Sequence, residues 1–153
     1  MKIEGKLEEM GLKLPEVPKP VANYVPAVKT GNLLFISGHG PQKEIGTLST
    51  GKVGRDLTLE EGYEAAKNVA LRLLSTIKDT VDDLDKVKRV VKLVGFVNCS
   101  ENFTDQPKVV NGASDLFVEV FGERGIHARS AVGMYQLPGG IPVEIEAVVE
   151  VED

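Results

Sequence analysis

The chain has 153 residues, enough for one domain with a hydrophobic core that needs no disulfide or metal to hold it. A hydrophobic content of 42% excludes a disordered chain, and the single cysteine, Cys99, excludes an internal disulfide. The net charge of −5 and the aromatic content of 5% argue against a nucleic-acid partner. Because no run is apolar enough for a signal peptide or a membrane span, we expect a cytoplasmic protein.

The first twenty residues predict an arm. Lys2 to Met10 has the pattern of a short polar helix that ends at Gly11, and Pro15, Pro18 and Pro20 then force an extended path. We therefore divide the chain into a helical and proline-rich arm, residues 1–20, and a single domain, residues 21–153.

A first β-hairpin is predicted where the arm ends. Two apolar runs, Tyr24 to Val28 and Leu33 to Ser37, flank a turn that contains Gly and Asn. The second run ends at Gly38-His39-Gly40, and glycines at a strand end mark a place where another group approaches the backbone closely.

The stretch from Gly46 to Lys52 has the spacing of a phosphate-binding loop. The next residue is Val53, which lacks the hydroxyl group that would bind magnesium, and no helix pattern begins there. We therefore interpret the match as a coincidental glycine-rich loop.

Two amphipathic helices are predicted. Thr58-Leu59-Glu60-Glu61 forms a capping box, and apolar residues recur at helical spacing as far as about Val81. Pro107 suits the first position of the second helix, which Gly122 ends. Asn111 is the polar exception in the second helix, and we expect it to face solvent or a loop.

The remaining strands are read from their density of β-branched residues. Val87 to Val97 predicts a strand between the two helices. Ile126 to Val151 contains two apolar runs around Pro138-Gly139-Gly140 and predicts a second β-hairpin. The order β-β-α-β-α-β-β predicts an α+β fold, a two-layer sandwich with two helices on one face of a mixed sheet.

The predicted C-terminal hairpin carries the candidate chemistry. Arg129 lies among small residues on its first arm, and Glu144 and Glu146 alternate with apolar residues on the second, which places both acids on one face. A guanidinium group can bind a carboxylate through two parallel hydrogen bonds. The hairpin is therefore either a site for a small carboxylic acid or a solvated sheet face.

Five short segments share an order and spacing with a known family. They are Tyr24-Val25, Ile36-Ser37-Gly38, Asn111, Ala128-Arg129-Ser130 and Glu144-Ile145-Glu146-Ala147. Together they resemble the YjgF/RidA family of reactive-intermediate deaminases, also called the L-PSP endoribonuclease family. The resemblance covers about Val21 to Val151, and the arm and the longer loop after residue 42 make the chain more similar to a longer, less characterised branch.

The resemblance implies a chorismate-mutase-like fold, a homotrimer with clefts between subunits, and hydrolysis of 2-imino acids to 2-keto acids and ammonia without a cofactor or metal. It implies that Arg129 binds the substrate carboxylate and that Glu144 positions the attacking water. It further implies that Tyr24, Ser37, Gly38, His39 and Asn111 line or shape the cleft.

The chain also departs from the deaminase pattern. Ala131 stands where cysteine is frequent, His39 stands where glutamine is frequent, and Gln136 replaces the arginine of an Arg-Leu-Pro run. The natural substrate is therefore open. Two alternatives remain beside a deaminase: a non-catalytic trimer that binds small carboxylates, and an endoribonuclease.

In a hairpin centred on Pro138 and Gly139, Arg129 would lie four residues from Glu144 along the strands, or ~13 Å. His127 is expected to be a strand-end residue rather than a proton shuttle.

Overall fold

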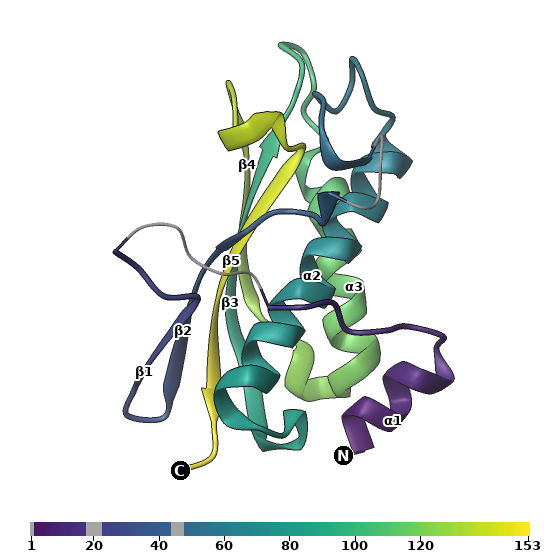
Figure 1. Ribbon diagram of the computed structural model, residues 1–153. Helices are drawn as coiled ribbons and strands as arrows, with labels where there is room; N and C mark the ends of the chain where they lie inside the picture. Colours follow the sequence, from purple (N-terminus) through teal and green to yellow (C-terminus); the bar gives the residue numbers. More distant parts are fainter. Residues whose placement is uncertain (1, 18–22, 44–47) are drawn as a thin grey trace.

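The computed structural model describes residues 2–17, 23–43 and 48–153. Five strands form one mixed sheet in the order β1-β2-β5-β3-β4, and helices α2 and α3 lie side by side against one face of it (Figure 1). The α+β two-layer architecture is therefore confirmed. The elements are α1 (Lys2–Glu9), β1 (Ala27–Thr30), β2 (Leu33–His39), α2 (Leu59–Val81), η2 (Leu84–Lys86), β3 (Val87–Asn98), α3 (Gln106–Phe121), η3 (Gly122–Gly125), β4 (Ala128–Met134), η4 (Pro138–Gly140) and β5 (Val143–Val151).

The two long helices form as their caps and apolar stripes predict. The Thr58 hydroxyl accepts the Glu61 N–H, and the Glu61 carboxylate accepts the Thr58 N–H, so the capping box is confirmed. Gly122 ends α3 with a φ of 65°, a conformation that favours glycine. The helix stripes meet the buried residues of β3 and β5 in one core.

The N-terminal helix α1 joins this core. Ile3 and Leu7 are buried in it, and the Asp85 carboxylate accepts the backbone N–H groups of Lys2 and Ile3 at 2.8 and 2.9 Å. The carboxylate thereby satisfies two of the N–H groups that a helix start leaves unpaired. Of the predicted arm, Pro18 and Pro20 lie outside the described residues. No helix in the described ranges is both long and apolar enough to cross a membrane.

The first hairpin is confirmed, with β1 beginning later than predicted. Antiparallel pairing runs from Ala27 opposite Ile36 to Thr30 opposite Leu33. Gly31 in the two-residue connection has a φ of 57°, as a tight hairpin turn requires.

The predicted C-terminal hairpin is wrong. β4 and β5 do not pair with each other: β4 pairs in parallel with the outer edge of β3, and β5 lies between β2 and β3, antiparallel to both. Helix α3 returns the chain to the start of β3, so β4 must run parallel to β3. Alternation of apolar residues identifies strands but not their partners, which is why the sequence suggested the simpler pairing.

The connection 135–142 must therefore cross the end of β3. A set of hydrogen bonds made by Lys52 and Asn98, which we call the clasp, holds it there. Lys52 Nζ donates to Asn98 Oδ1 at 2.8 Å and to the carbonyl oxygen of Tyr135. Asn98 Nδ2 in turn donates to the Ile141 carbonyl oxygen at 3.1 Å, and the Asn98 N–H donates to the Pro142 carbonyl oxygen. Because Asn98 is 4% exposed, its side-chain bonds are partly shielded from water, whereas the bond from Lys52 to Tyr135 is exposed.

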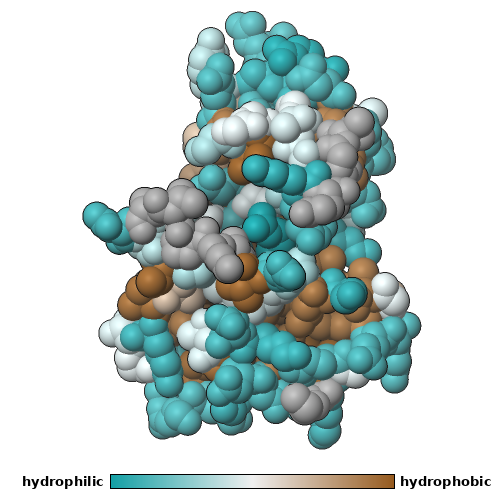
Figure 2. Space-filling view, viewed as in Figure 1, coloured by the Kyte–Doolittle hydropathy of each residue, from teal (hydrophilic) through white to brown (hydrophobic). Residues whose placement is uncertain are grey.

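Among the described residues, helices cover one face of the sheet and no helix covers the other. Figure 2 shows a mainly hydrophilic upper end, where the loops gather, and hydrophobic residues reaching the surface of the lower half. On the open sheet face, Val28, Phe35 and Val132 are 54%, 47% and 40% exposed. An apolar sheet face without a cover favours contact with another protein surface.

His39 lies inside the fold, between β2 and α2. Its Nδ1–H donates to the Ser37 carbonyl oxygen at 2.7 Å, so neutral Nε2 accepts from the Thr76 hydroxyl at 2.7 Å. Burial lowers the pKa of His39 and outweighs the opposing hydrogen bond to Ser37.

The free energy of unfolding should fall as the pH drops below about 6.5. In the unfolded chain His39 then binds a proton, whereas in the folded protein its lowered pKa keeps it neutral. This proton contributes at most ~1.4 kcal/mol per pH unit. The free energy of unfolding, measured with urea between pH 7.5 and 5.5, should fall less steeply with decreasing pH in His39→Gln than in the wild type. Equal slopes in the two proteins would contradict this role, and His127→Gln separates the contribution of the second histidine.

Candidate functional site

The predicted site residues fall into two groups on opposite sides of the sheet. Arg129 is level with Leu93 on β3, and Leu93 is level with Ala147 on β5. Leu93 and Ala147 are buried beneath the helices, so Arg129 also projects toward the helix layer. Glu144 alternates with the buried residues of β5 and projects from the open face.

Arg129 is held by neutral groups of α3. Its Nη1 donates to Asn111 Oδ1 at 2.7 Å and to Ser114 Oγ at 3.1 Å. Within the described ranges no carboxylate forms an ion pair with Arg129, and its hydrogen bonds all run from Nη1. The Nε and Nη2 groups, the side of the guanidinium fork that best fits a carboxylate, therefore remain for a ligand.

Asn111 and Ser114 lie three residues apart on α3, which places them on one side of the helix. The expectation that Asn111 faces solvent or a loop is wrong, because its side chain contacts Arg129. Ser114 was missed by the sequence analysis. Its spacing from Asn111 was the signal that could have found it.

Glu144 packs against the backbone of β2. A side chain at Gly38 would place its Cβ 2.5 Å from Glu144 Oε2, so only glycine fits this contact as it stands. Burial, and secondarily the charge of Glu146, raises the pKa of Glu144. A carboxyl group with a raised pKa exchanges protons more readily near neutral pH.

Ser37 and Tyr24 come from the strand and loop beside Glu144. Ser37 Oγ donates to the Val25 carbonyl oxygen at 2.8 Å, which ties β2 to the segment before β1. Tyr24 is exposed and lines a hollow of about 1160 Å³ with Gly40, Arg72 and Pro138. His39, by contrast, directs both ring nitrogens into the interior and presents neither of them to this surface.

Arg129 and Glu144 are far apart, but not because of the four-residue offset along a hairpin that the sequence predicted. Arg129 is level with Leu93 and Glu144 with Phe96, with β3 lying between the two strands. The backbones are ~10 Å apart along the strands and ~10 Å across them. Since the side chains also project to opposite faces, one chain cannot bring these two groups onto one small substrate.

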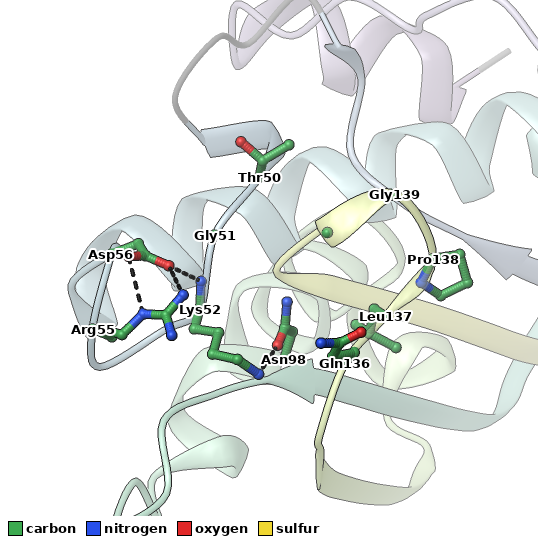
Figure 3. Close-up of a pocket in the computed structure, with 11 residues that line it drawn as sticks. Thr50, Gly51, Lys52, Arg55, Asp56, Asn98, Gln136, Leu137, Pro138 and Gly139 are labelled. Carbon is green, nitrogen blue, oxygen red and sulfur yellow. Dashed lines mark hydrogen bonds and ion pairs between the residues drawn. The ribbon is translucent and has the colours of Figure 1, made fainter.

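A hollow of about 830 Å³ at the loop end is lined by neither Arg129 nor Glu144, and it shares Pro138 with the hollow beside Tyr24 (Figure 3). Lys52 reaches across it to Asn98, and Arg55 pairs with Asp56 at 2.9 Å. The Lys52 ammonium group thus serves the clasp rather than a phosphate. Of the glycine-rich loop, Gly46 and Thr47 lie outside the described residues, and α2 begins only at Leu59.

Comparisons with known proteins bear on the family and the fold of the chain. Residues 4–140 match a family model described as "YjgF/chorismate mutase-like, putative endoribonuclease". The chain belongs to the YjgF family. Protein TCP17 of Trypanosoma cruzi is 47% identical, with 99% of this chain and 96% of that protein covered.

A solved structure and a second relative are also similar to this chain. The crystal structure of Atu1372, a protein of unknown function from Agrobacterium tumefaciens, is 45% identical, with a TM-score of 0.91 over 99% of this chain and 93% of that one. A 2-iminobutanoate/2-iminopropanoate deaminase of Dermatophagoides farinae is 28% identical, with 92% of this chain and 95% of that protein covered. The YjgF fold predicted by the resemblance is thereby confirmed.

Gly38→Ala should displace the Glu144 carboxylate, because the new Cβ would overlap Oε2. The free energy of unfolding should change by less than ~1 kcal/mol, since the end of a flexible side chain can move aside. The pKa of Glu144, followed by NMR of its carboxyl carbon, should fall toward the ordinary value as the group enters solvent. Gly5→Ala, which meets no neighbour, is the matched control. An unchanged Glu144 pKa in Gly38→Ala would refute the contact.

Proposed function

We propose that this YjgF protein hydrolyses small 2-imino acids, and their enamine tautomers, to 2-keto acids and ammonia in a cleft between subunits of a homotrimer. The observation that carries the proposal is Arg129, a half-buried guanidinium held by Asn111 and Ser114 with no ion pair to a described carboxylate. Such a group is prepared for an external carboxylate.

The chemistry needs only binding, orientation and proton transfer. Water adds to the C=N carbon, and the tetrahedral adduct then expels ammonia to leave the C=O group of the keto acid. Arg129 would hold the carboxylate through Nε and Nη2. Glu144, whose pKa burial raises, would orient the water and pass its proton to the departing nitrogen. Positioned acid–base groups of this kind typically contribute ~10²–10⁴-fold in rate.

The cleft is assigned to the junction of two subunits because one chain keeps Arg129 and Glu144 on opposite faces. The open sheet face offers the contact surface, since Val28, Phe35 and Val132 are exposed on it. Arg129 and Asn111 would form one wall. The neighbouring subunit would supply Glu144, with Gly38, Ser37 and Tyr24 around it, and His39 would support that wall from behind.

The mite relative that bears the deaminase name supports the reaction class at 28% identity. Ala131, which departs from the deaminase pattern, lies two residues from Arg129 on β4 and leaves the size and polarity of the substrate side chain open. A non-catalytic carboxylate binder would use the same Arg129 and would differ only in turnover.

Arg129→Ala should lower kcat/KM for 2-iminopropanoate about 10²-fold, because the carboxylate loses a charged two-bond partner. Arg129→Lys should recover little of this loss, since an ammonium group lacks the fork. The rate of imine loss, followed with freshly generated substrate, measures both. Arg55→Ala is the control, because Arg55 is exposed, lines the loop-end hollow and belongs to neither group of site residues. Wild-type protein that binds 2-keto acids without accelerating imine loss would favour the non-catalytic binder, and RNA cleavage that survives Arg129→Ala would favour the ribonuclease.

Mixing two inactive variants should restore activity if the cleft is shared. Arg129→Ala and Glu144→Gln chains, unfolded together and refolded, should form mixed trimers in which some clefts contain both intact groups. Arg129→Ala mixed with Asn111→Ala should recover none, because these two residues belong to one wall. Failure of the first mixture, with mixed trimers verified by native mass spectrometry, would place both groups in one subunit.

A further inference from the structure

Beside Arg129 lies a serine–histidine pair that the proposed reaction does not yet use. Ser114 Oγ is 2.9 Å from His127 Nε2 and 3.1 Å from Arg129 Nη1. The other ring nitrogen, Nδ1, is 2.6 Å from the carbonyl oxygen of Gly125. These contacts form a chain from the backbone of η3 to the guanidinium group.

The direction of each hydrogen bond follows from the two ends of the chain. The Gly125 carbonyl can only accept, so Nδ1 carries the proton of the neutral imidazole and Nε2 accepts from the Ser114 hydroxyl. Burial lowers the pKa of His127 despite the hydrogen bond to Gly125, which keeps the ring neutral at neutral pH. Because the Ser114 O–H donates its hydrogen bond to His127, a lone pair of Ser114 Oγ accepts the hydrogen bond from Arg129 Nη1.

The imidazole is itself held in place. Its ring meets Phe117 of α3 edge to face, with centroids 6.5 Å apart and an angle of 84° between the planes. His127 directly precedes β4, and Ser114 and Phe117 are three residues apart on α3. The pair therefore joins the strand that carries Arg129 to the helix that orients it.

We infer that Ser114 and His127 are positioning residues, which fix Nη1 of Arg129 and so direct Nε and Nη2 at the carboxylate of the substrate. The inference rests on the proposed function for its ligand. Asn111 alone would leave the guanidinium free to pivot about a single hydrogen bond. Ser114 supplies the second acceptor for Nη1. His127 accepts the hydroxyl proton of Ser114 in a hydrogen bond, so the Ser114 oxygen rather than its proton faces Arg129.

The first test needs no ligand. Long-range ¹H–¹⁵N NMR of His127 should show the Nδ1–H tautomer, and the Arg129 side chain should show slow rotation of its Nη groups. Ser114→Ala and His127→Phe should both speed this rotation, and Ser114→Thr, which keeps the hydroxyl, should restore it. An Nε2–H tautomer, or rotation that none of these changes affects, would overturn the inference.

The second test uses 2-oxobutanoate as an unreactive probe in titration calorimetry. Ser114→Ala and His127→Phe should each raise its Kd about 10-fold, the cost of one lost hydrogen bond to a charged group. Ser114→Thr should bind within about threefold of the wild type. Ser100→Ala, in the loop that follows β3 and outside both groups of site residues, is the matched control and should not change the Kd.

The two tests separate the inference from the proposed function. Wild-type protein that binds no 2-oxobutanoate would count against the proposed function, and the NMR measurements would still decide the role of Ser114 and His127. Ser114→Ala that binds as tightly as the wild type, while Arg129→Ala does not bind, would overturn the inference and leave the function standing. With turnover measured, KM should rise in both variants more than kcat falls.

Discussion

The structure depends on the position of β5, whose backbone hydrogen-bonds to β2 on one side and to β3 on the other. This pairing makes the last strand the centre of the sheet and sends β4 to its edge. Arg129 then lies on an edge strand beneath α3, while Glu144 lies on the central strand and faces away from the helices. The same placement that closes the core thus divides the candidate chemistry between two surfaces.

Local patterns in the sequence were sufficient for the helices and the first hairpin. The capping box at Thr58, the apolar stripes and the Gly-Asn turn are interactions between residues close in the chain, and each predicts its element without knowledge of the rest. The partner of a strand is set by residues far away. The pairing of β4 with β3 was therefore missed. It depends on the direction in which α3 returns the chain, and the sequence of Ala128–Met134 carries no signal of that direction.

The candidate site shows the same division. Arg129 and Glu144 could be named from residue type and family resemblance, but that Arg129 is held by Asn111 and Ser114 could not, since contacts between α3 and β4 depend on packing. His39 shows the opposite case. The family resemblance implied that His39 lines or shapes the cleft, whereas hydrogen bonds to Ser37 and Thr76 hold its ring inside the fold. A polar residue at a strand end is compatible with either location.

The central position of β5 also affects how the sheet can assemble during translation. While residues 143–151 are still within the exit tunnel, β2 and β3 have emerged and each has an unpaired edge where β5 will insert. The nascent chain must keep that gap open, without pairing with a neighbouring nascent chain, until residues 143–151 have emerged. A sheet whose central strand follows its other four strands in the chain therefore has two unpaired edges until β5 becomes available.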